Sequence, residues 1–209
     1  MHIYSAQMTA VGGSQIEAAE LVTRIRNVAS TATGLTLSAW GTIVGAPYGS
    51  FAVSMRVDGM AELLESTAKL AGDEAWAALA GDSARLFAGP AEIRFQTVIA
   101  ATTEQMNSTP IVSINRSQIA NGQIKTAIGR SVEMLNFVKG VTGIDGMLAM
   151  SDGGPSNELA FIFGVDSAEA GDEANAALAA DPTWLDMMDS AGHLFVSGSG
   201  HRTYAARMP

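Results

Sequence analysis

Two segments with the same plan decide the fold: VDGMAELLESTAKLAGDEAW at residues 57–76 and VDSAEAGDEANAALAADPTW at residues 165–184. Both open with Val-Asp and close on Asp-x-x-Trp, so the second segment follows the first by 108 residues. At this spacing, without gaps, further matches extend along both halves and include Ile3 with Ile111, Gln15 with Gln123 and Leu86 with Leu194. We therefore interpret the chain as a tandem duplication of a unit of about 100 residues.

A second internal match is a coincidence. GDEAWAALAGD at residues 72–82 returns as GDEANAALAAD at residues 171–181, at a spacing of 99. Extending that alignment needs compensating gaps on both sides, and its matches are mostly alanines, which recur by chance in Ala-rich helices. The spacing of 108 is therefore the one that indicates the duplication.

Composition narrows the class of protein. The chain has 209 residues, of which 47% are hydrophobic, with a formal net charge of −9 and no cysteine. It is too apolar for disorder, has no run near the roughly 18 apolar residues of a membrane span, and starts without a signal-peptide pattern. The lack of cysteine excludes disulfides, thiolate metal sites and a cysteine nucleophile. The acidic charge makes nucleic acid and anionic membrane poor partners, and we expect a cytoplasmic protein.

The first half, residues 1–100, predicts the element order β-α-β-β-α-β. Strands are predicted at residues 2–9, 35–44, 51–57 and 91–100, and a helix at 59–81. Ser14 and Glu17 have the capping-box spacing that begins a helix, and Gly34 is typical of the residue that follows one.

The second half, residues 111–209, follows a polar linker predicted at 101–110 and repeats the order. Strands are predicted at residues 111–116, 147–151 and 158–165, and a helix at 123–140. Asp181 and Pro182 predict a new helix start, since Asp caps helices and Pro fits the first helical position. The last strand is predicted over residues 193–196 and 202–207.

The element order is that of two ferredoxin-like α+β units. Four antiparallel strands with both helices on one face leave the other face uncovered, and that face must be buried. The second copy is the obvious cover, so we expect the two units to pack sheet to sheet as an intramolecular α+β barrel, a pseudo-dimer within one chain. Burial then requires no other subunit, although further self-association stays open.

This order, with the repeated segment ending in Asp-x-x-Trp, resembles the dimeric α+β-barrel superfamily, which includes antibiotic-biosynthesis monooxygenases, in its tandem fused form. The resemblance covers nearly the whole chain and is more specific for fold than for function. It implies a cavity between sheet and helices that binds a hydrophobic or aromatic small molecule, and a cofactor-independent monooxygenase reaction. The superfamily also contains haem-binding and haem-degrading proteins, isomerases and proteins without known activity.

Candidate site residues come from the differences between the halves, because duplication frees one pocket to specialise. At the spacing of 108, polarity differs where Asn115, Arg116, His201 and Tyr204 match Gln7, Met8, Ile93 and Gln96. We predict His201 as a catalytic base, with Asn115 and Tyr204 hydrogen-bonding the substrate anion. The predicted ligand-binding residues are apolar, aromatic or cationic: Trp40, Met55, Arg56, Arg116 and Phe163.

Two alternatives remain open. Haem-degrading proteins of the superfamily use an Asn on the first strand, a Trp and a helical His, and Asn115, Trp184 and His193 supply these residue types. Trp184 can equally be a packing residue, since Trp76 matches it. The other alternative is a non-catalytic module that binds a protein partner. No metal site is expected, because none of the three histidines pairs with another at zinc-site spacing.

Overall fold

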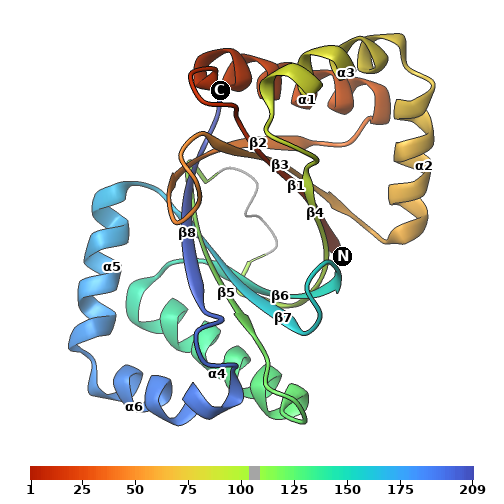
Figure 1. Ribbon diagram of the computed structural model, residues 1–209. Helices are drawn as coiled ribbons and strands as arrows, with labels where there is room; N and C mark the ends of the chain where they lie inside the picture. Colours follow the sequence, from red (N-terminus) through yellow and green to blue (C-terminus); the bar gives the residue numbers. More distant parts are fainter. Residues whose placement is uncertain (104–108) are drawn as a thin grey trace. The chain divides into compact units, whose positions relative to one another are not determined.

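The computed structural model describes residues 1–103 and 109–209 (Figure 1). Within them lie eight strands, six α-helices and one short 3-10 helix. The chain divides into two compact units: unit 1 is Met1–Gln96 with Ala205–Pro209, and unit 2 is Thr97–Tyr204. Of the linker predicted at 101–110, residues 104–108 lie outside the described residues.

The elements follow the predicted order in both halves. The first half contains β1 (His2–Thr9), α1 (Gln15–Thr33), β2 (Leu37–Val44), β3 (Ser50–Val57), α2 (Met60–Ala71), α3 (Glu74–Leu86) and β4 (Glu92–Ala101). The second half contains β5 (Ile111–Gln118), α4 (Ile124–Thr142), β6 (Gly146–Gly153), β7 (Glu158–Val165), α5 (Ala168–Ala180), α6 (Pro182–Ala191), η1 (Gly192–Leu194) and β8 (His201–Arg207).

The strands form a closed barrel in the order β1-β3-β2-β8-β5-β7-β6-β4. β1 and β2 pair antiparallel with β3, and β5 and β6 pair antiparallel with β7. Read around the barrel, β4-β1-β3-β2 is followed by β8-β5-β7-β6, so equivalent strands recur in the same order. The predicted fold class, a tandem α+β barrel of ferredoxin-like repeats, is confirmed.

Strand pairing shows that the repeat contains a one-residue gap. Tyr4 pairs with Met55 and Ser113 pairs with Phe163, so β1 and β5 are 109 residues apart, whereas β3 and β7 are 108 apart. The ungapped spacing of 108 is therefore wrong for β1 and β5. A one-residue slip in a strand moves every side chain to the other face of the sheet. Asn115 thus corresponds to Ala6, and Arg116 to Gln7.

The start of α1 differs from the prediction. The Ser14 side chain accepts no capping hydrogen bond; its Oγ donates to the carbonyl oxygen of Val11 at 2.7 Å and to that of Leu86 at 3.4 Å. The capping-box prediction is wrong because this hydroxyl ties the helix start to the end of α3. The predicted helix end is confirmed, since Gly34 has φ 76° and its N–H donates to Ser30. A positive φ of this size favours glycine.

The helical stretch predicted at 59–81 consists of two helices. Asp73 separates α2 from α3, and its carboxylate accepts a hydrogen bond from the N–H of Trp76 at 2.8 Å. Asp181 does the same between α5 and α6, accepting from the N–H groups of Thr183 and Trp184 at 2.8 and 3.2 Å. The Asp-x-x-Trp motif is therefore a helix N-cap followed by a packing tryptophan.

Residues 193–196 do not form the predicted strand. They begin in η1, and Phe195 makes an isolated bridge with Ile119. Phe87 and Ala10 make the same bridge in unit 1. The apolar pattern correctly predicted that Leu194 is buried. One bridge, rather than a full strand, is enough to hold the segment in place.

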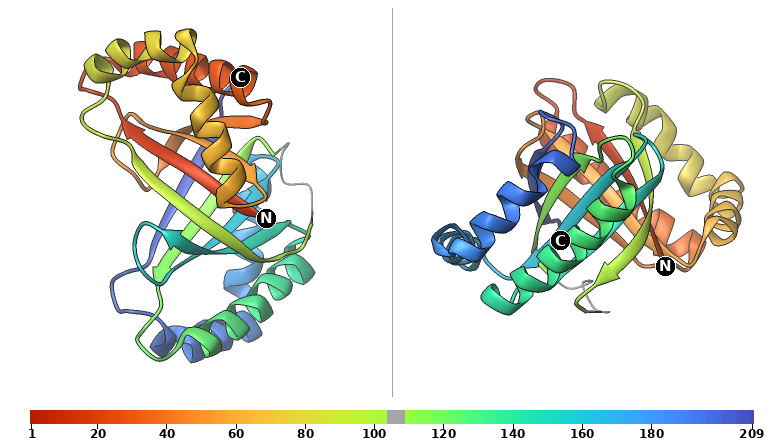
Figure 2. Two further views of the ribbon diagram at one scale, coloured as in Figure 1. Left: turned by 90° about the vertical axis from the view of Figure 1, so that its right-hand side faces the viewer. Right: turned by 90° about the horizontal axis from the view of Figure 1, so that it is seen from below.

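Within each unit the helices lie on one face of the strands (Figure 2). The largest core cluster of unit 1 includes Leu21, Val22 and Leu86, and that of unit 2 includes Leu135, Leu148 and Leu194. Among the described residues, none of the helices has the length and hydrophobicity needed to cross a bilayer.

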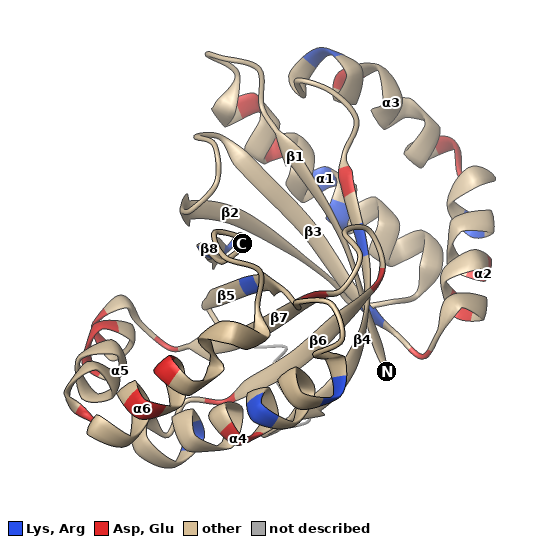
Figure 3. Cartoon of the chain, turned by 60° about the horizontal axis from the view of Figure 1, so that its bottom comes forward, with Lys and Arg blue, Asp and Glu red and all other residues tan. Residues whose placement is uncertain are grey.

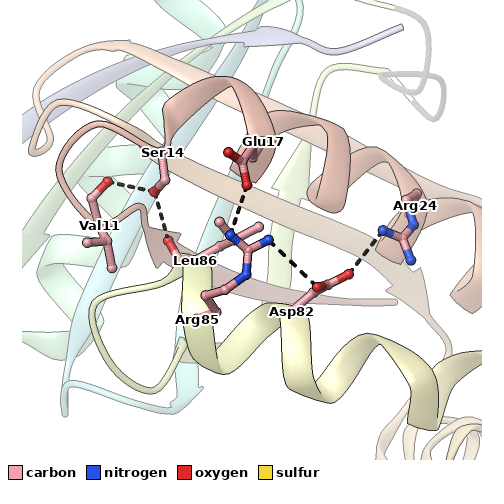
Figure 4. Close-up of polar contacts among 7 residues, drawn as sticks. All are labelled: Val11, Ser14, Glu17, Arg24, Asp82, Arg85 and Leu86. Carbon is pink, nitrogen blue, oxygen red and sulfur yellow. Dashed lines mark hydrogen bonds and ion pairs between the residues drawn. The ribbon is translucent and has the colours of Figure 1, made fainter.

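Exposed ion pairs join α1 to α3 in unit 1 (Figure 4). Arg85 lies 2.9 Å from Glu17 and 3.8 Å from Asp82, and Asp82 lies 3.2 Å from Arg24. Solvent screens such pairs, so they contribute little beside the apolar contacts beneath them.

Candidate functional site

Unit 2 contains a cavity of about 450 Å³ between its strands and its helices. The lining residues come from strands β5, β7 and β8 on one side and from helices α4, α5 and α6 on the other. Figure 1 labels these elements. Most of the lining is apolar. These lining residues are Met134, Val138, Ile144, Phe161, Phe163, Val165, Leu178, Trp184, Met188, Ala191 and Phe195.

Helix α5 covers this cavity without filling it. None of its residues is buried, although Gly171, Ala174, Asn175 and Leu178 line the cavity. Hydrogen bonds fix both ends of the helix, since the Ser167 hydroxyl accepts from the N–H of Ala170 at 3.1 Å and Asp181 caps the next helix. An apolar helix face over open space leaves apolar surface available to a ligand.

Small residues create the space. Ser113 lies opposite Phe163 in the β5–β7 pair, and Gly171 lies in the first turn of α5, with only Val165 within 4 Å of a Cβ placed there. The Phe163 ring occupies the position above Gly146, where an added Cβ would lie 2.5 Å from the ring. Phe163 stacks on Phe161 with ring centroids 6.1 Å apart, which fixes both rings on the strand side of the cavity.

A polar cluster interrupts the apolar lining and consists of Asn115, Asn175, Arg202 and Tyr204. Arg202 is its hub. Its Nε donates to Asn115 Oδ1 at 2.5 Å, and its Nη1 donates to Asn175 Oδ1 at 3.2 Å and to the Tyr204 hydroxyl at 3.1 Å. Asn175 Nδ2 also donates to the Tyr204 hydroxyl, at 3.4 Å. The cluster thus ties β5, β8 and α5 together along one wall.

The cluster changes the acidity of Tyr204. Burial by itself raises the pKa of this phenol, but hydrogen bonds from Asn175 and Arg202, the Arg202 charge and a hydrogen bond with Ser113 together lower it below its usual value of 10.0. These groups stabilise the phenolate more than burial opposes it. Tyr204 is therefore more acidic than an ordinary tyrosine.

The structure brings five of the predicted site residues to the cavity: Asn115, Arg116, Phe163, His201 and Tyr204. Two of these five residues, Arg116 and His201, do not share a strand face with the polar side chains of the cavity. Arg116 alternates with Asn115 along β5, so its side chain projects from the other face, 3.7 Å from Glu158. His201 alternates in the same way with Arg202 on β8 and is exposed. The role of each in function stays a prediction.

The other three predicted residues lie in unit 1. Trp40 Nε1 donates to Ser54 at 2.9 Å, and the Arg207 guanidinium lies 4.5 Å from the Trp40 ring centroid. Arg56 shares a face of β3 with Ser54, and burial lowers its pKa. Met55 projects to the opposite face and is buried in a cluster with Val57 and Phe95. A binding role for these three residues also stays a prediction.

The sequence reasoning missed Arg202 and Asn175. At a spacing of 108, Arg202 matches Arg94 and looks like a shared structural residue. However, β4 begins at Glu92 and β8 at His201, 109 residues later, so Arg202 corresponds to Ile93. With the gap in place, the polarity difference that selected Asn115 would have selected Arg202 as well.

Of the three residues predicted for the haem alternative, two line the cavity and one does not. Asn115 and Trp184 line the cavity, and Trp184 stacks on Phe137 with centroids 6.2 Å apart, whereas His193 is exposed in η1 and does not line it. No lining residue on the helical wall offers an imidazole to a haem iron. Within residues 1–103 and 109–209, no three His, Asp or Glu side chains cluster as metal ligands.

The fold and the cavity together define a fused α+β-barrel protein. By sequence, the chain matches none of the known protein families and none of the curated proteins with which it was compared. By structure, it is similar to a protein from Fusobacterium nucleatum provisionally named a monooxygenase, with a TM-score of 0.73 and 7% identity over 100% of this chain and 92% of the other.

Two further solved structures have the same fold. One is an anthrone oxidase-like protein, with a TM-score of 0.68 and 11% identity over 100% of this chain and 91% of the other. The other is a major regulator of staphylococcal pathogenesis, with a TM-score of 0.63 and 9% identity over the full length of both chains. At these identities the likeness establishes the monooxygenase-like α+β-barrel fold and leaves the activity to be argued from the site.

Proposed function

We propose that unit 2 binds a small aromatic molecule beneath α5 and catalyses its oxidation by O2. The observation that carries this proposal is the combination of an apolar cavity of about 450 Å³ with a single polar cluster on one wall. Small-molecule sites commonly measure about 300–1,000 Å³ and combine an apolar lining with a few polar groups that orient the ligand. The likeness to an anthrone oxidase-like protein supports an electron-rich aromatic ketone as substrate.

The cavity residues supply an acid–base step and anion stabilisation. Tyr204, as phenolate, accepts a proton from the methylene carbon that lies between the two rings of an anthrone. The carbonyl oxygen then carries the negative charge of the enolate, and the N–H groups of Arg202 and Asn175, which donate to the Tyr204 hydroxyl, are the donors that can stabilise it. Phe161, Phe163 and Trp184 supply aromatic surface for the rings.

The overall reaction balances with O2 as the only co-reactant. The enolate carbon forms a bond to one oxygen atom, and the O–O bond breaks. That oxygen becomes the second carbonyl of the quinone, and the other leaves as water with the two hydrogens that the carbon has lost. Anthrone and O2 thus give anthraquinone and water. The apolar walls favour this course because they exclude water from the enolate.

Oxygen uptake with anthrone as substrate tests the proposal, with anthraquinone quantified by chromatography. We expect turnover by the full chain and a loss of about a hundredfold in Tyr204→Phe, the low end of the contribution of a positioned acid–base group. Tyr48→Phe is the matched control, because Tyr48 is 87% exposed in unit 1. An equal rate in both variants would remove Tyr204 from the reaction. Failure to bind any aromatic probe would favour the partner-binding alternative.

A further inference from the structure

Arg202 is a cation whose hydrogen-bond partners, within the described part of the chain, include no carboxylate. Its three hydrogen bonds go to the amide oxygens of Asn115 and Asn175 and to the phenol oxygen of Tyr204. Among the residues that the structure describes, no carboxylate forms an ion pair with it. A guanidinium has five N–H donors, so the two on Nη2 are left for a ligand or for water.

No carboxylate in the cavity lining balances the charge of Arg202. The chain has 21 acidic residues, yet none of the cavity-lining residues is Asp or Glu. Figure 3 shows acidic residues on α5 and α6, but those of α5, which are Glu169, Asp172 and Glu173, are exposed and do not line the cavity. The lining also includes Arg116, which has its own carboxylate partner in Glu158 at 3.7 Å. The net charge of the lining is therefore positive in a strongly acidic protein.

The cavity is also polarised from one end to the other. Arg202, Asn175 and His201 are exposed, whereas Met134, Val138 and Ala191 on the helical wall are at most 6% exposed. A ligand that satisfies both ends has an anionic group at the exposed end and an aromatic body inside. Charge-assisted hydrogen bonds to a carboxylate are stronger than those to a neutral oxygen.

We infer that the ligand of unit 2 is an aromatic carboxylate, whose carboxylate binds the free Nη2 edge of Arg202 and whose rings lie against Phe161, Phe163 and Trp184. This inference rests on the proposed function of the cavity and adds the charge of the substrate. It explains why the cluster is built around an arginine, whose charge is permanent, rather than around a neutral donor.

Two probes of similar shape, one anionic and one neutral, test whether the charge of the ligand contributes to its affinity. 2-Naphthoate and 2-naphthamide have nearly the same shape, and their affinities for the full chain can be measured by isothermal titration calorimetry. We expect naphthoate to bind about tenfold more tightly, the difference that one charge-assisted hydrogen bond makes, and this preference to shrink as salt is added. Equal affinity of the two probes would overturn the inference and leave the proposed function standing. If neither probe binds, both fail.

Variants of the protein then test whether Arg202 is the group that recognises the anionic probe. Arg202→Gln should abolish the preference, whereas Arg130→Gln, which removes an equal charge from α4 outside the cavity lining, where Arg130 pairs with Glu133 at 2.8 Å, should retain it. Arg202→Lys keeps the charge and should retain part of the preference, so it replaces Arg202→Gln if that variant fails to fold by circular dichroism. A preference that survives in folded Arg202→Gln, or that Arg202→Lys loses entirely, would contradict the assignment.

Discussion

The two units follow one plan but use the space between sheet and helices differently. In unit 1, Tyr4, Leu37 and Leu63 pack around buried Met55, Val57 and Phe95. At the equivalent positions of Tyr4, Leu37 and Leu63, unit 2 has Ser113, Gly146 and Gly171, and Ser113 and Gly171 line the cavity. Where unit 1 has large core side chains, unit 2 thus has smaller side chains on the same backbone plan, beside a cavity.

The two units also differ in polarity at neighbouring positions. The cluster residues Asn115 and Tyr204 occupy places held in unit 1 by Ala6 and Phe95, and Phe95 stacks on His2 with centroids 4.9 Å apart. Unit 1 therefore uses aromatic packing where unit 2 uses hydrogen bonds. The comparison teaches that two copies of one plan can differ in use: unit 1 has large apolar side chains where unit 2 has small residues and a charged, hydrogen-bonded cluster.

The largest expected effect is on stability. It comes from placing a leucine, the residue that unit 1 has at position 37, at the equivalent and crowded position 146 of unit 2. In Gly146→Leu, the new Cβ would lie 2.5 Å from the Phe163 ring and 2.9 Å from Leu135. We expect a loss of about 3 kcal/mol in the free energy of unfolding, the upper end for an overpacked core, measured by urea denaturation.

The double variant Gly146→Leu with Phe163→Met recreates the Leu37–Met55 pair of unit 1. It should recover most of the lost stability, because the smaller, flexible Met vacates the space that Leu needs. A double variant no more stable than Gly146→Leu alone would show that the two units are not equivalent at this position.

The second effect is on ligand affinity. Gly171→Leu gives unit 2 the equivalent of Leu63, and the site has room for it, since the nearest side-chain atom is Val165 Cγ1 at 3.4 Å. We expect affinity for aromatic probes to fall at least about tenfold, or 1.4 kcal/mol. Stability should rise slightly, since Leu is the better helix former. Gly129→Leu on the exposed face of α4 is the control and should leave the affinity unchanged.

The third effect compares the two helix caps. Asp73 accepts one backbone N–H and Asp181 accepts two. Replacing Asp73 with Ala should cost about 1 kcal/mol of stability, and replacing Asp181 should cost more, because two donors lose their partner. Thermal denaturation measures both, with exposed Asp186→Ala as the control. The reverse order would show that the second hydrogen bond contributes nothing.

The smallest effect is spectroscopic. The pKa of Tyr204 lies below 10.0 because of its hydrogen bonds and Arg202, whereas burial raises the pKa of Tyr4 in unit 1. As pH rises, Tyr204 should ionise before Tyr4, and the oxidation rate should rise with the Tyr204 phenolate. Tyrosinate absorbance measures this: Tyr204→Phe should remove the earliest component and Tyr4→Phe the latest. Loss of the latest component in Tyr204→Phe would contradict both directions.

Much of the fold could be predicted from the sequence because its signals are local. The helix caps at Asp181 and Gly34 and the alternation in residues 51–57 depend on neighbouring residues alone, and the structure agrees with each. The errors have tertiary causes. Ser14 donates across to Leu86 instead of capping its own helix, and residues 193–196 need only one bridge to be buried.

The candidate site was predictable in part. Polarity differences between the halves selected Asn115 and Tyr204, and both line the cavity. The same reasoning missed Arg202 because a one-residue gap in the repeat is invisible without strand pairing. It also could not separate Trp40 and Arg56, which lie in unit 1, from the cavity residues, since the repeated pattern does not show which copy contains the cavity.

By itself, the amino-acid sequence determined the duplication, the order of strands and helices and the α+β fold, because these follow from local propensities and from the repeated pattern. The tertiary structure alone decided where the cavity lies and which polar groups meet in it. Residues 115, 175, 202 and 204 come from three separate elements and become neighbours only through hydrogen bonds between strands and a capped helix packed above them. A long-range contact of this kind has no local signature, because its free energy depends on groups that are distant in the chain.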